Sequence, residues 1–222
     1  MKVCTDACIL GAWAADKINN NIVDASAVLD IGAGTGLLSL MLAQKSNGKI
    51  DAIEIEKNSF AQAAYNFEQS PWSSRLRIIN TDVKNFAATK NYSFIISNPP
   101  FYQNDLLSPV ENKNVAKHHA RLSINELIVS IRRLLDELGS FAVLVPDHRV
   151  AELEKVAKEN YFFLKEKLLI RQTSHHEYFR GILLFDQTNN EACINNELII
   201  KNEDGNYSKE FVELMKDYYL YL

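Results

Sequence analysis

The sequence predicts an α/β protein with a mostly parallel sheet and helices on both faces. Short apolar runs alternate with helical segments along most of the chain, and this alternation is typical of parallel sheets. The 222 residues are 47% hydrophobic and 23% charged, which fits one domain spanning residues 1–222. Two strand-like runs, 162–171 and 178–185, predict an antiparallel hairpin at the sheet edge. We therefore expect a seven-stranded sheet, followed by a C-terminal strand and helix in 196–222.

The boundaries of the other elements follow from capping signals and apolar runs. Thr5 or Asp6 can cap an N-terminal helix, because a small apolar stretch follows them. Ser123 and Glu126 have capping-box spacing and predict a helix that runs through Leu138. The strands expected in the parallel part of the sheet are 27–31, 49–54, 76–80, 92–97 and 141–145.

Composition argues against several classes of protein. No apolar run is long enough to cross a bilayer and no signal-peptide pattern is present, so we expect a cytoplasmic protein without a membrane partner. The three cysteines, Cys4, Cys8 and Cys193, indicate a reducing compartment. No second Cys or His pair completes a zinc set, so we expect packing residues and no metal. A net charge of −4 disfavours a generic nucleic-acid binder but leaves room for a local basic patch. We expect a monomer.

A glycine-rich turn, Gly32-Ala33-Gly34-Thr35-Gly36, follows an apolar run that contains Asp30. Glycine tolerates positive φ and lets a ligand approach the backbone closely, so the turn predicts a small-molecule site. The dinucleotide fingerprint G-x-G-x-x-G places its third glycine one residue later. The spacing found here, with an acid at the strand end, resembles the nucleoside loop of S-adenosylmethionine-dependent methyltransferases. A tight strand-to-helix turn without a ligand is the alternative.

Polar residues also end the next three predicted strands. Glu54 closes the second strand, Asp82 follows the third and Asn98 closes the fourth. Because ligands of open α/β sheets lie outside the carboxyl ends of the strands, these side chains are expected to face one site. Glu54 could accept hydrogen bonds from two ribose hydroxyls, and Asp82 from an adenine amino group. A single acid at a strand end is often only a solvated terminus, but the shared placement favours a ligand.

The sequence Asn98-Pro99-Pro100-Phe101 is the most informative for chemistry. Two prolines restrict the backbone and remove two N–H donors, which leaves the Asn98 amide oxygen and the Pro99 carbonyl as acceptors. A planar amine that donates two hydrogen bonds fits this pair, and its lone pair would then face a methyl on sulfur. Phe101 can stack on a base, a contact worth about 1–3 kcal/mol. Asn98, Pro99 and Phe101 are therefore the predicted catalytic residues.

This combination resembles the class I amino-methyltransferases, whose [N/D]-P-P-[Y/F] motif holds a substrate nitrogen. Adenine-N6, guanine-N2 and glutamine-amide methyltransferases all use the motif, so the tetrapeptide alone leaves the substrate open. The flanking sequence is similar to the bacterial valine-tRNA adenine-N6 methyltransferases over nearly the whole chain. The segments that carry this similarity include Met1-Lys2-Val3-x-Thr5-Asp6, Leu10-Gly11-Ala12-Trp13, Leu29-Asp30-Ile31-Gly32, Gln69-Ser70-Pro71-Trp72 and Asn206-Tyr207-Ser208.

The resemblance implies a Rossmann-like class I methyltransferase fold, S-adenosyl-L-methionine as cofactor and tRNA as partner. The implied reaction is methylation of N6 of adenosine 37 in valine tRNA, next to the anticodon. Guanine-N2 methylation of ribosomal RNA is a second reading of the same motif, and glutamine methylation of a protein is a weaker third. A cofactor-binding, RNA-associated protein without catalysis is the alternative from a different class.

The resemblance also implies which residues bind the cofactor. Lys2, Thr5 and Asp6 would lie beside it, Glu54 would hold the ribose, and Asp82 the adenine. Asp30 and the glycines would lie at its amino-acid end, and the cofactor-binding residues in this part of the chain would be Asp30, Gly32, Ala33, Gly34, Gly36 and Asn98. Met1 matches an internal methionine of the family, so an upstream segment is expected to be missing.

Basic residues in two segments could contact RNA phosphates. The polar segment 102–122 follows the Pro-Pro motif and has no clear period, which predicts a substrate loop. Solvated surface charge is the alternative for both segments. The candidate cations are Lys113, Lys117 and Arg121 in this loop, and Arg171 and Arg180 in the predicted hairpin.

Overall fold

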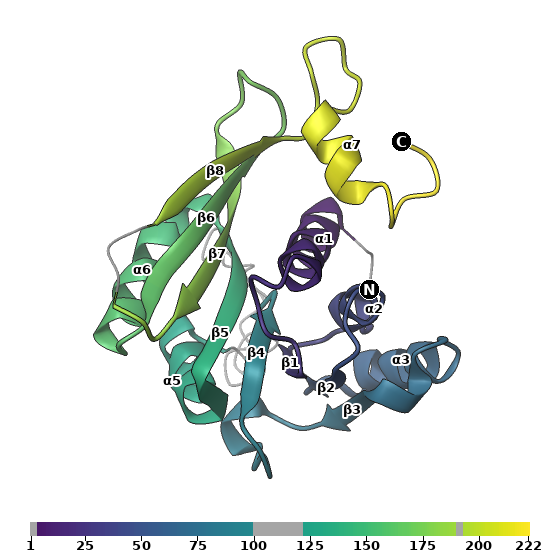
Figure 1. The fold of residues 1–222 in the computed structure, drawn as a ribbon, viewed down its shortest axis with the longest axis vertical. Coiled ribbons are helices and arrows are strands. Elements are labelled where there is room, and N and C mark those ends of the chain that lie inside the picture. Colours follow the sequence, from purple (N-terminus) through teal and green to yellow (C-terminus); the bar gives the residue numbers. More distant parts are fainter. Residues whose placement is uncertain (1–3, 100–121, 190–192) are drawn as a thin grey trace, which may run out of the picture.

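An eight-stranded sheet runs through the computed structural model, which describes residues 4–99, 122–189 and 193–222 (Figure 1). The strand order is β3-β2-β1-β4-β5-β7-β6-β8. Only β7 is reversed within this sheet, since it pairs antiparallel with both β5 and β6. The strands are β1 (Ala27–Ile31), β2 (Lys49–Glu54), β3 (Leu76–Asn80), β4 (Tyr92–Ser97), β5 (Leu135–Pro146), β6 (Phe163–Arg171), β7 (Tyr178–Asp186) and β8 (Ile194–Ile199).

The mostly parallel α/β sheet is confirmed, but the expected count of seven strands and the place of the hairpin are wrong. The hairpin of β6 and β7 does not form the edge, because β8 lies outside it. β8 pairs parallel with β6, from Glu166 opposite Ile194 to Arg171 opposite Ile199. The C-terminal strand expected in 196–222 therefore begins earlier, at Ile194, and joins the sheet as its eighth member.

Helices cover both faces of the sheet (Figure 1). On one face, α1, α2 and α7 pack over a core that includes Leu10, Leu42 and Phe211. On the same face, Phe67 of α3 belongs to a small cluster with Ala52 of the sheet. On the other face, α5 and α6 enclose a second core that includes Ile128 and Leu153. The helices are α1 (Thr5–Asn19), α2 (Leu37–Ala43), α3 (Lys57–Glu68), α5 (Ile124–Leu134), α6 (Val150–Glu159) and α7 (Lys209–Met215), with 3-10 turns η1 (Ser73–Arg75), η2 (Val83–Asn85) and η3 (Asp147–Arg149).

The junction of α5 and β5 differs from the prediction. The capping box of Ser123 and Glu126 is confirmed, but the helix ends at Leu134 instead of Leu138. Leu135 is already extended (φ −81°, ψ 141°) and pairs with Tyr92 of β4. A Cβ added at Gly139 would lie 3.0 Å from the carbonyl oxygen of Tyr92. The glycine therefore allows close approach of two strands and does not terminate the helix.

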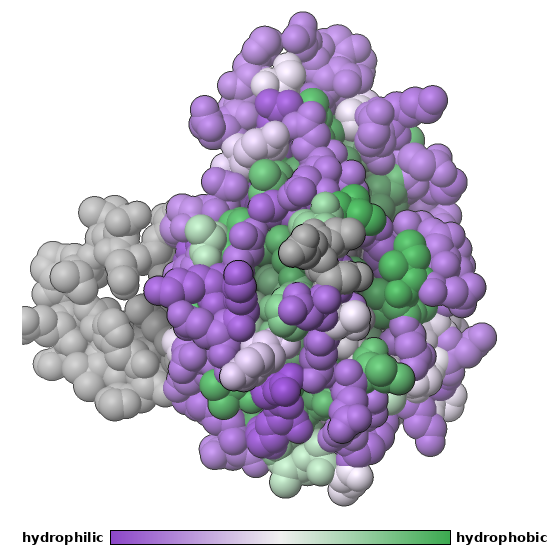
Figure 2. Space-filling view, turned by 60° about the vertical axis from the view of Figure 1, so that its left-hand side comes forward, coloured by the Kyte–Doolittle hydropathy of each residue, from purple (hydrophilic) through white to green (hydrophobic). Residues whose placement is uncertain are grey.

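The outer surface on the side of β8 and α6 is mainly hydrophilic, with hydrophobic residues scattered singly or in small groups (Figure 2). Scattered apolar residues are normal for a protein surface. In the described ranges, no helix combines the length and apolar character that crossing a membrane requires.

Candidate active site

A cavity of about 350 Å³ lies at the edge of the sheet where the parallel strands end, which we call the carboxyl edge. Its volume is within the range of small-molecule sites. Apolar residues from β1, β2, α1 and α2 form much of its wall, and a few polar side chains also line it. The lining includes Cys4, Ala7, Ile31, Gly32, Ala33, Gly34, Thr35, Leu38, Ile53, Glu54, Ile55, Ser59, Thr81, Asp82, Val83, Lys84, Asn98, Pro99 and Leu122.

The glycine-rich turn forms one wall of this cavity. Gly32 and Gly34 have positive φ (74° and 58°), so glycine is needed for the backbone to bend here. The N–H groups of Gly32 and Ala33 donate to the carbonyl of Ile53, which fixes the turn against β2. Gly36 does not line the cavity; a side chain in its place would collide with the ring of Phe67. The structure therefore places Gly36 against Phe67 of α3, and its predicted cofactor contact stays a prediction.

Glu54 connects the turn to the end of β2. Its Oε2 accepts from the N–H of Gly34 and its Oε1 from the N–H of Glu56, both at 2.8 Å. The side chain is nearly buried but reaches the cavity. A carboxylate has about four acceptor positions, so Glu54 keeps capacity for a ribose diol. Ile55, the next residue, lines the cavity and is 49% exposed; the prediction missed this apolar contact surface.

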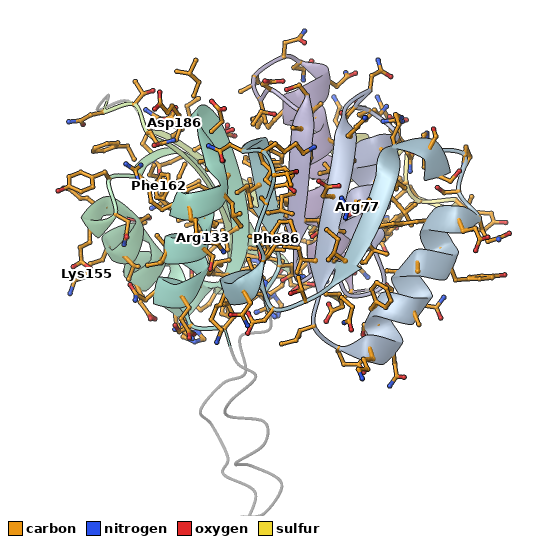
Figure 3. The ribbon with its side chains drawn as sticks, turned by 90° about the horizontal axis from the view of Figure 1, so that it is seen from below. Arg77, Phe86, Arg133, Lys155, Phe162 and Asp186 are labelled. Atoms are coloured by element: carbon orange, nitrogen blue, oxygen red, sulfur yellow. The ribbon has the colours of Figure 1, made fainter. Side chains whose placement is uncertain are left out.

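Asp82 reaches the cavity from the end of β3 and begins the turn η2. Its Oδ1 accepts from the backbone N–H of Lys84 at 2.9 Å. Arg133 of α5 holds the same segment, since its guanidinium donates to the carbonyls of Val83 (2.8 Å) and Phe86 (2.5 Å). Arg133 and Phe86 lie near each other in Figure 3. The wall that would meet an adenine ring is therefore fixed from α5, a link that the sequence did not reveal.

Asp30 lies beneath the glycine-rich turn and is completely buried. Its Oδ2 accepts from the Oγ (2.7 Å) and N–H (3.2 Å) of Ser39. Among the described residues, its Oδ1 has no hydrogen-bond partner. Burial raises the pKa of Asp30 to about 7. Asp30 does not line the cavity and lies behind the turn; its predicted role at the amino-acid end of the cofactor stays a prediction.

Asn98 and Pro99 bring the predicted amine-binding acceptors to the same cavity. β4 ends at Ser97, whose hydroxyl donates to the carbonyl of Ile31 at 2.8 Å and fixes this strand end beside the glycine-rich turn. Asn98 is half-buried and Pro99 is buried, and both line the cavity. A substrate nitrogen held by these oxygens would therefore lie in the cavity that Glu54 and Asp82 also face. The predicted stacking residue Phe101 lies outside the described residues.

The first turn of α1 contains two of the residues predicted to lie beside the cofactor, Thr5 and Asp6. Cys4 is the N-cap of α1, without a side-chain cap, and Thr5 and Asp6 belong to the helix itself. Cys4 and Ala7 line the main cavity, whereas Thr5 and Asp6 line a second one. As side chains two residues apart point to different faces of a helix, Thr5 and Asp6 turn away from the predicted cofactor site. Lys2 lies outside the described residues.

The predicted RNA-binding cations are only partly placed. Arg180 Nε lies 2.8 Å from Asp6 Oδ2, and Arg171 Nη2 lies 2.8 Å from Glu197 Oε2. Both arginines are therefore paired with acids within the chain. The described residues hold no group of three His, Cys, Asp or Glu side chains suited to a metal ion. Lys113, Lys117 and Arg121 of the predicted substrate loop lie outside the described residues.

Comparisons with known proteins agree with this geometry. The family model for the methyltransferase small domain matches residues 14–153. The tRNA1(Val) (adenine(37)-N6)-methyltransferase of Dyadobacter fermentans is 41% identical over 224 residues, which cover 99% of this chain and 91% of the relative.

Solved structures share the fold at low sequence identity. A predicted O-methyltransferase from Agrobacterium tumefaciens has a TM-score of 0.74 and 16% identity, and the match covers 96% of each chain. The glycopeptide N-methyltransferase MtfA, solved in complex with S-adenosyl-L-methionine, has a TM-score of 0.59 and 11% identity over 80% of this chain and 94% of MtfA.

The strand order, the glycine-rich turn and the polar strand ends define a class I S-adenosylmethionine-dependent methyltransferase. Within that class, the chain belongs to the tRNA1(Val) (adenine(37)-N6)-methyltransferase family.

Replacement of Asp30 by Asn should change how stability depends on pH. The folded-state pKa of about 7 exceeds the ordinary value of 3.8, so folding favours the protonated form. The wild type should lose stability as pH rises from 4 to 7, whereas Asp30→Asn should not. From pH 5 to pH 8 the variant should gain roughly 2–3 kcal/mol relative to the wild type. Urea unfolding without ligand at both pH values measures this; a gap independent of pH would contradict the assigned burial.

Replacement of Arg133 by Met should weaken cofactor binding without preventing catalysis. The loss of two hydrogen bonds to the Val83–Phe86 segment loosens the support of Asp82, and we expect the Kd for S-adenosylmethionine to rise about threefold to tenfold. Isothermal titration calorimetry measures the Kd. Arg132→Met is the matched control, because Arg132 contacts Gln187 and Phe162 instead. Equal effects of both variants would refute the positioning role of Arg133.

Proposed function

We propose that this chain transfers the methyl group of S-adenosylmethionine to the exocyclic N6 of adenosine 37 in valine tRNA. The observation that carries the proposal is that Asn98 and Pro99 line the same cavity as the glycine-rich turn and Glu54. The similarity to the tRNA1(Val) (adenine(37)-N6)-methyltransferase of Dyadobacter fermentans, at 41% identity over nearly the whole chain, supports this choice of substrate.

The residues of the main cavity fit the cofactor. When bound, S-adenosylmethionine supplies an electrophilic methyl group on a sulfonium. Glu54 is placed to accept from the ribose hydroxyls, and Asp82 with Val83 forms the wall for the adenine. Gly32, Ala33 and Gly34 bring backbone close to the amino-acid end, and the carboxyl group of Asp30 lies behind this turn with one unpartnered oxygen. The walls between these groups are mainly apolar, which excludes water from the reacting atoms.

Asn98 and Pro99 orient the substrate nitrogen. The amide oxygen of Asn98 and the carbonyl oxygen of Pro99 each accept one hydrogen bond from the adenine amino group. This holds the amino group in a fixed plane and directs the nitrogen lone pair at the methyl group. As the nitrogen gains positive charge, its N–H groups become stronger donors to these two oxygens, and one proton leaves the nitrogen after transfer to give the neutral methylated amine. The contact therefore stabilises the transition state more than the ground state.

The cellular setting is part of the proposal. A single chain is proposed as the catalytic unit, since residues of one chain line the cavity, and residues 1–222 are proposed to act as one domain. The cytoplasm is the proposed location because the proposed substrate, valine tRNA, is found there. The three free cysteines fit a reducing compartment. Arg171 and Arg180 are retained as proposed phosphate contacts, together with Lys113, Lys117 and Arg121.

The proposed function predicts which nucleoside becomes labelled. The protein is incubated with methyl-labelled cofactor and total RNA from cells that lack the enzyme, and the labelled nucleoside is mapped. We expect N6-methyladenosine at position 37 of valine tRNA. Label only in ribosomal RNA would favour guanine-N2 methylation, label only in protein would favour glutamine methylation, and cofactor binding without any label would favour a protein without catalysis. Each of these outcomes contradicts the proposal.

Replacement of Asn98 by Ala should abolish most methyl transfer. Because Asn98 supplies one of the two acceptors, we expect kcat to fall by about 10²–10³-fold, while the Kd for the cofactor changes less than about threefold. Single-turnover kinetics and calorimetry measure the two quantities separately. Asn195→Ala, on the exposed edge strand β8, is the control and should behave as wild type. Full activity of Asn98→Ala would show that this acceptor is dispensable.

A further inference from the structure

A second cavity, of about 300 Å³, lies on the other side of the first turn of α1. Thr5 and Asp6 line it, while their neighbours Cys4 and Ala7 line the main cavity. The first turn of α1 therefore separates the two cavities, and a helix with its side chains is about 10 Å in diameter. The remaining lining of the second cavity consists of Gln172, Phe179, Ile200, Lys201 and Tyr207.

The second cavity lies on the same edge of the sheet as the main one. Gln172 follows the last residue of β6, and Ile200 and Lys201 follow β8. The strands β6 and β8 both run parallel to β1. Phe179 lies at the start of the reversed strand β7, which begins at this edge. A substrate bound across the carboxyl edge therefore passes both cavities.

The lining of the second cavity includes two aromatic rings, those of Phe179 and Tyr207, and one lysine, Lys201. Tyr207 is 38% exposed and its ring stacks on Phe211, at 4.7 Å between centroids and 22° between planes. Phe211 is fully buried, so it supports Tyr207 from the protein side. The Nζ of Lys201 lies 5.6 Å from the centroid of the Tyr207 ring. A supported, exposed ring beside a cation is the combination that binds a nucleobase together with its phosphate.

The charge of the cavity suits a phosphate. Asp6 is neutralised by Arg180 at 2.8 Å; although burial alone would raise the pKa of Asp6, hydrogen bonds from Cys4 and Arg180 hold that pKa below its usual range. In the described part of the chain, no ion pair involves Lys201. The charges of Asp6 and Arg180 cancel, so the charge of Lys201 makes this cavity net positive.

We propose that the second cavity binds one nucleotide of the RNA substrate near the methylated adenosine, with its base against Tyr207 or Phe179 and its phosphate at Lys201. This inference rests on the proposed function, because it assumes that RNA crosses the carboxyl edge. It assigns to RNA recognition two residues, Lys201 and Tyr207, that lie outside the main cavity and outside the predicted set of cations.

The test compares the affinity of variants for valine tRNA at several salt concentrations, by fluorescence anisotropy with the full chain. Lys201→Gln should raise the Kd about tenfold and lower the slope of log Kd against log salt by about 0.7–0.9, the share of one phosphate contact. Tyr207→Leu should raise the Kd about fivefold to fiftyfold without changing that slope, because stacking is not ionic. Tyr207→Phe keeps the ring and should bind as wild type. Lys155→Gln on α6, at the opposite face of the sheet (Figure 3), is the charge-matched control.

Thermal unfolding and cofactor Kd are recorded for each variant, so that loss of fold is not mistaken for loss of RNA contact. Wild-type affinity of folded Lys201→Gln and Tyr207→Leu, or an equal slope change in Lys155→Gln, would overturn the nucleotide site. The labelled nucleoside is mapped in the same samples. If wild-type protein binds tRNA but labels another position, the proposed function fails while the affinity series still decides the second cavity.

Discussion

The carboxylate of Glu54 holds together the parts of the site that come from different segments. It joins the N–H of Gly34 to that of Glu56, so the glycine-rich turn, the end of β2 and the start of α3 share one anchor. These contacts also bury most of the charge, which is tolerable because each oxygen accepts a backbone hydrogen bond. Glu54 also lines the cavity, and its carboxylate can accept further hydrogen bonds there. The carboxylate that fixes the turn is therefore also the one proposed to bind the ribose.

Much of the site could be predicted because the sequence places special residues at strand ends, and parallel strands bring their carboxyl ends to one edge. Glu54, Asp82, Asn98 and Pro99 line one cavity for this reason. Gly36 and Asp30 could not be assigned in the same way. Their roles, packing on Phe67 and bonding to Ser39, depend on which neighbour packs behind the turn, and strand-end position carries no information about that.

The fold shows a similar division between local and long-range information. The capping box of Ser123 and Glu126 is local and was predicted. The end of α5 was misplaced because Leu135 is withdrawn from the helix by pairing with Tyr92, over forty residues away in sequence. The support of the Asp82 segment by Arg133 is likewise a long-range contact. The first turn of α1 divides Cys4 and Ala7 from Thr5 and Asp6, so one short motif contributes to two cavities.

The central claim is that Asn98 and Pro99 hold an exocyclic amine beside the cofactor. It is tested most directly with two anticodon stem-loops of valine tRNA that differ only at position 37, one with adenosine and one with purine riboside, which lacks the amino group. The measurement is methyl transfer from labelled cofactor to each RNA. If Asn98 and Pro99 hold an exocyclic amine, the adenosine RNA is methylated and the purine RNA is not. Equal labelling of both would contradict it, because the accepting atom would then lie elsewhere.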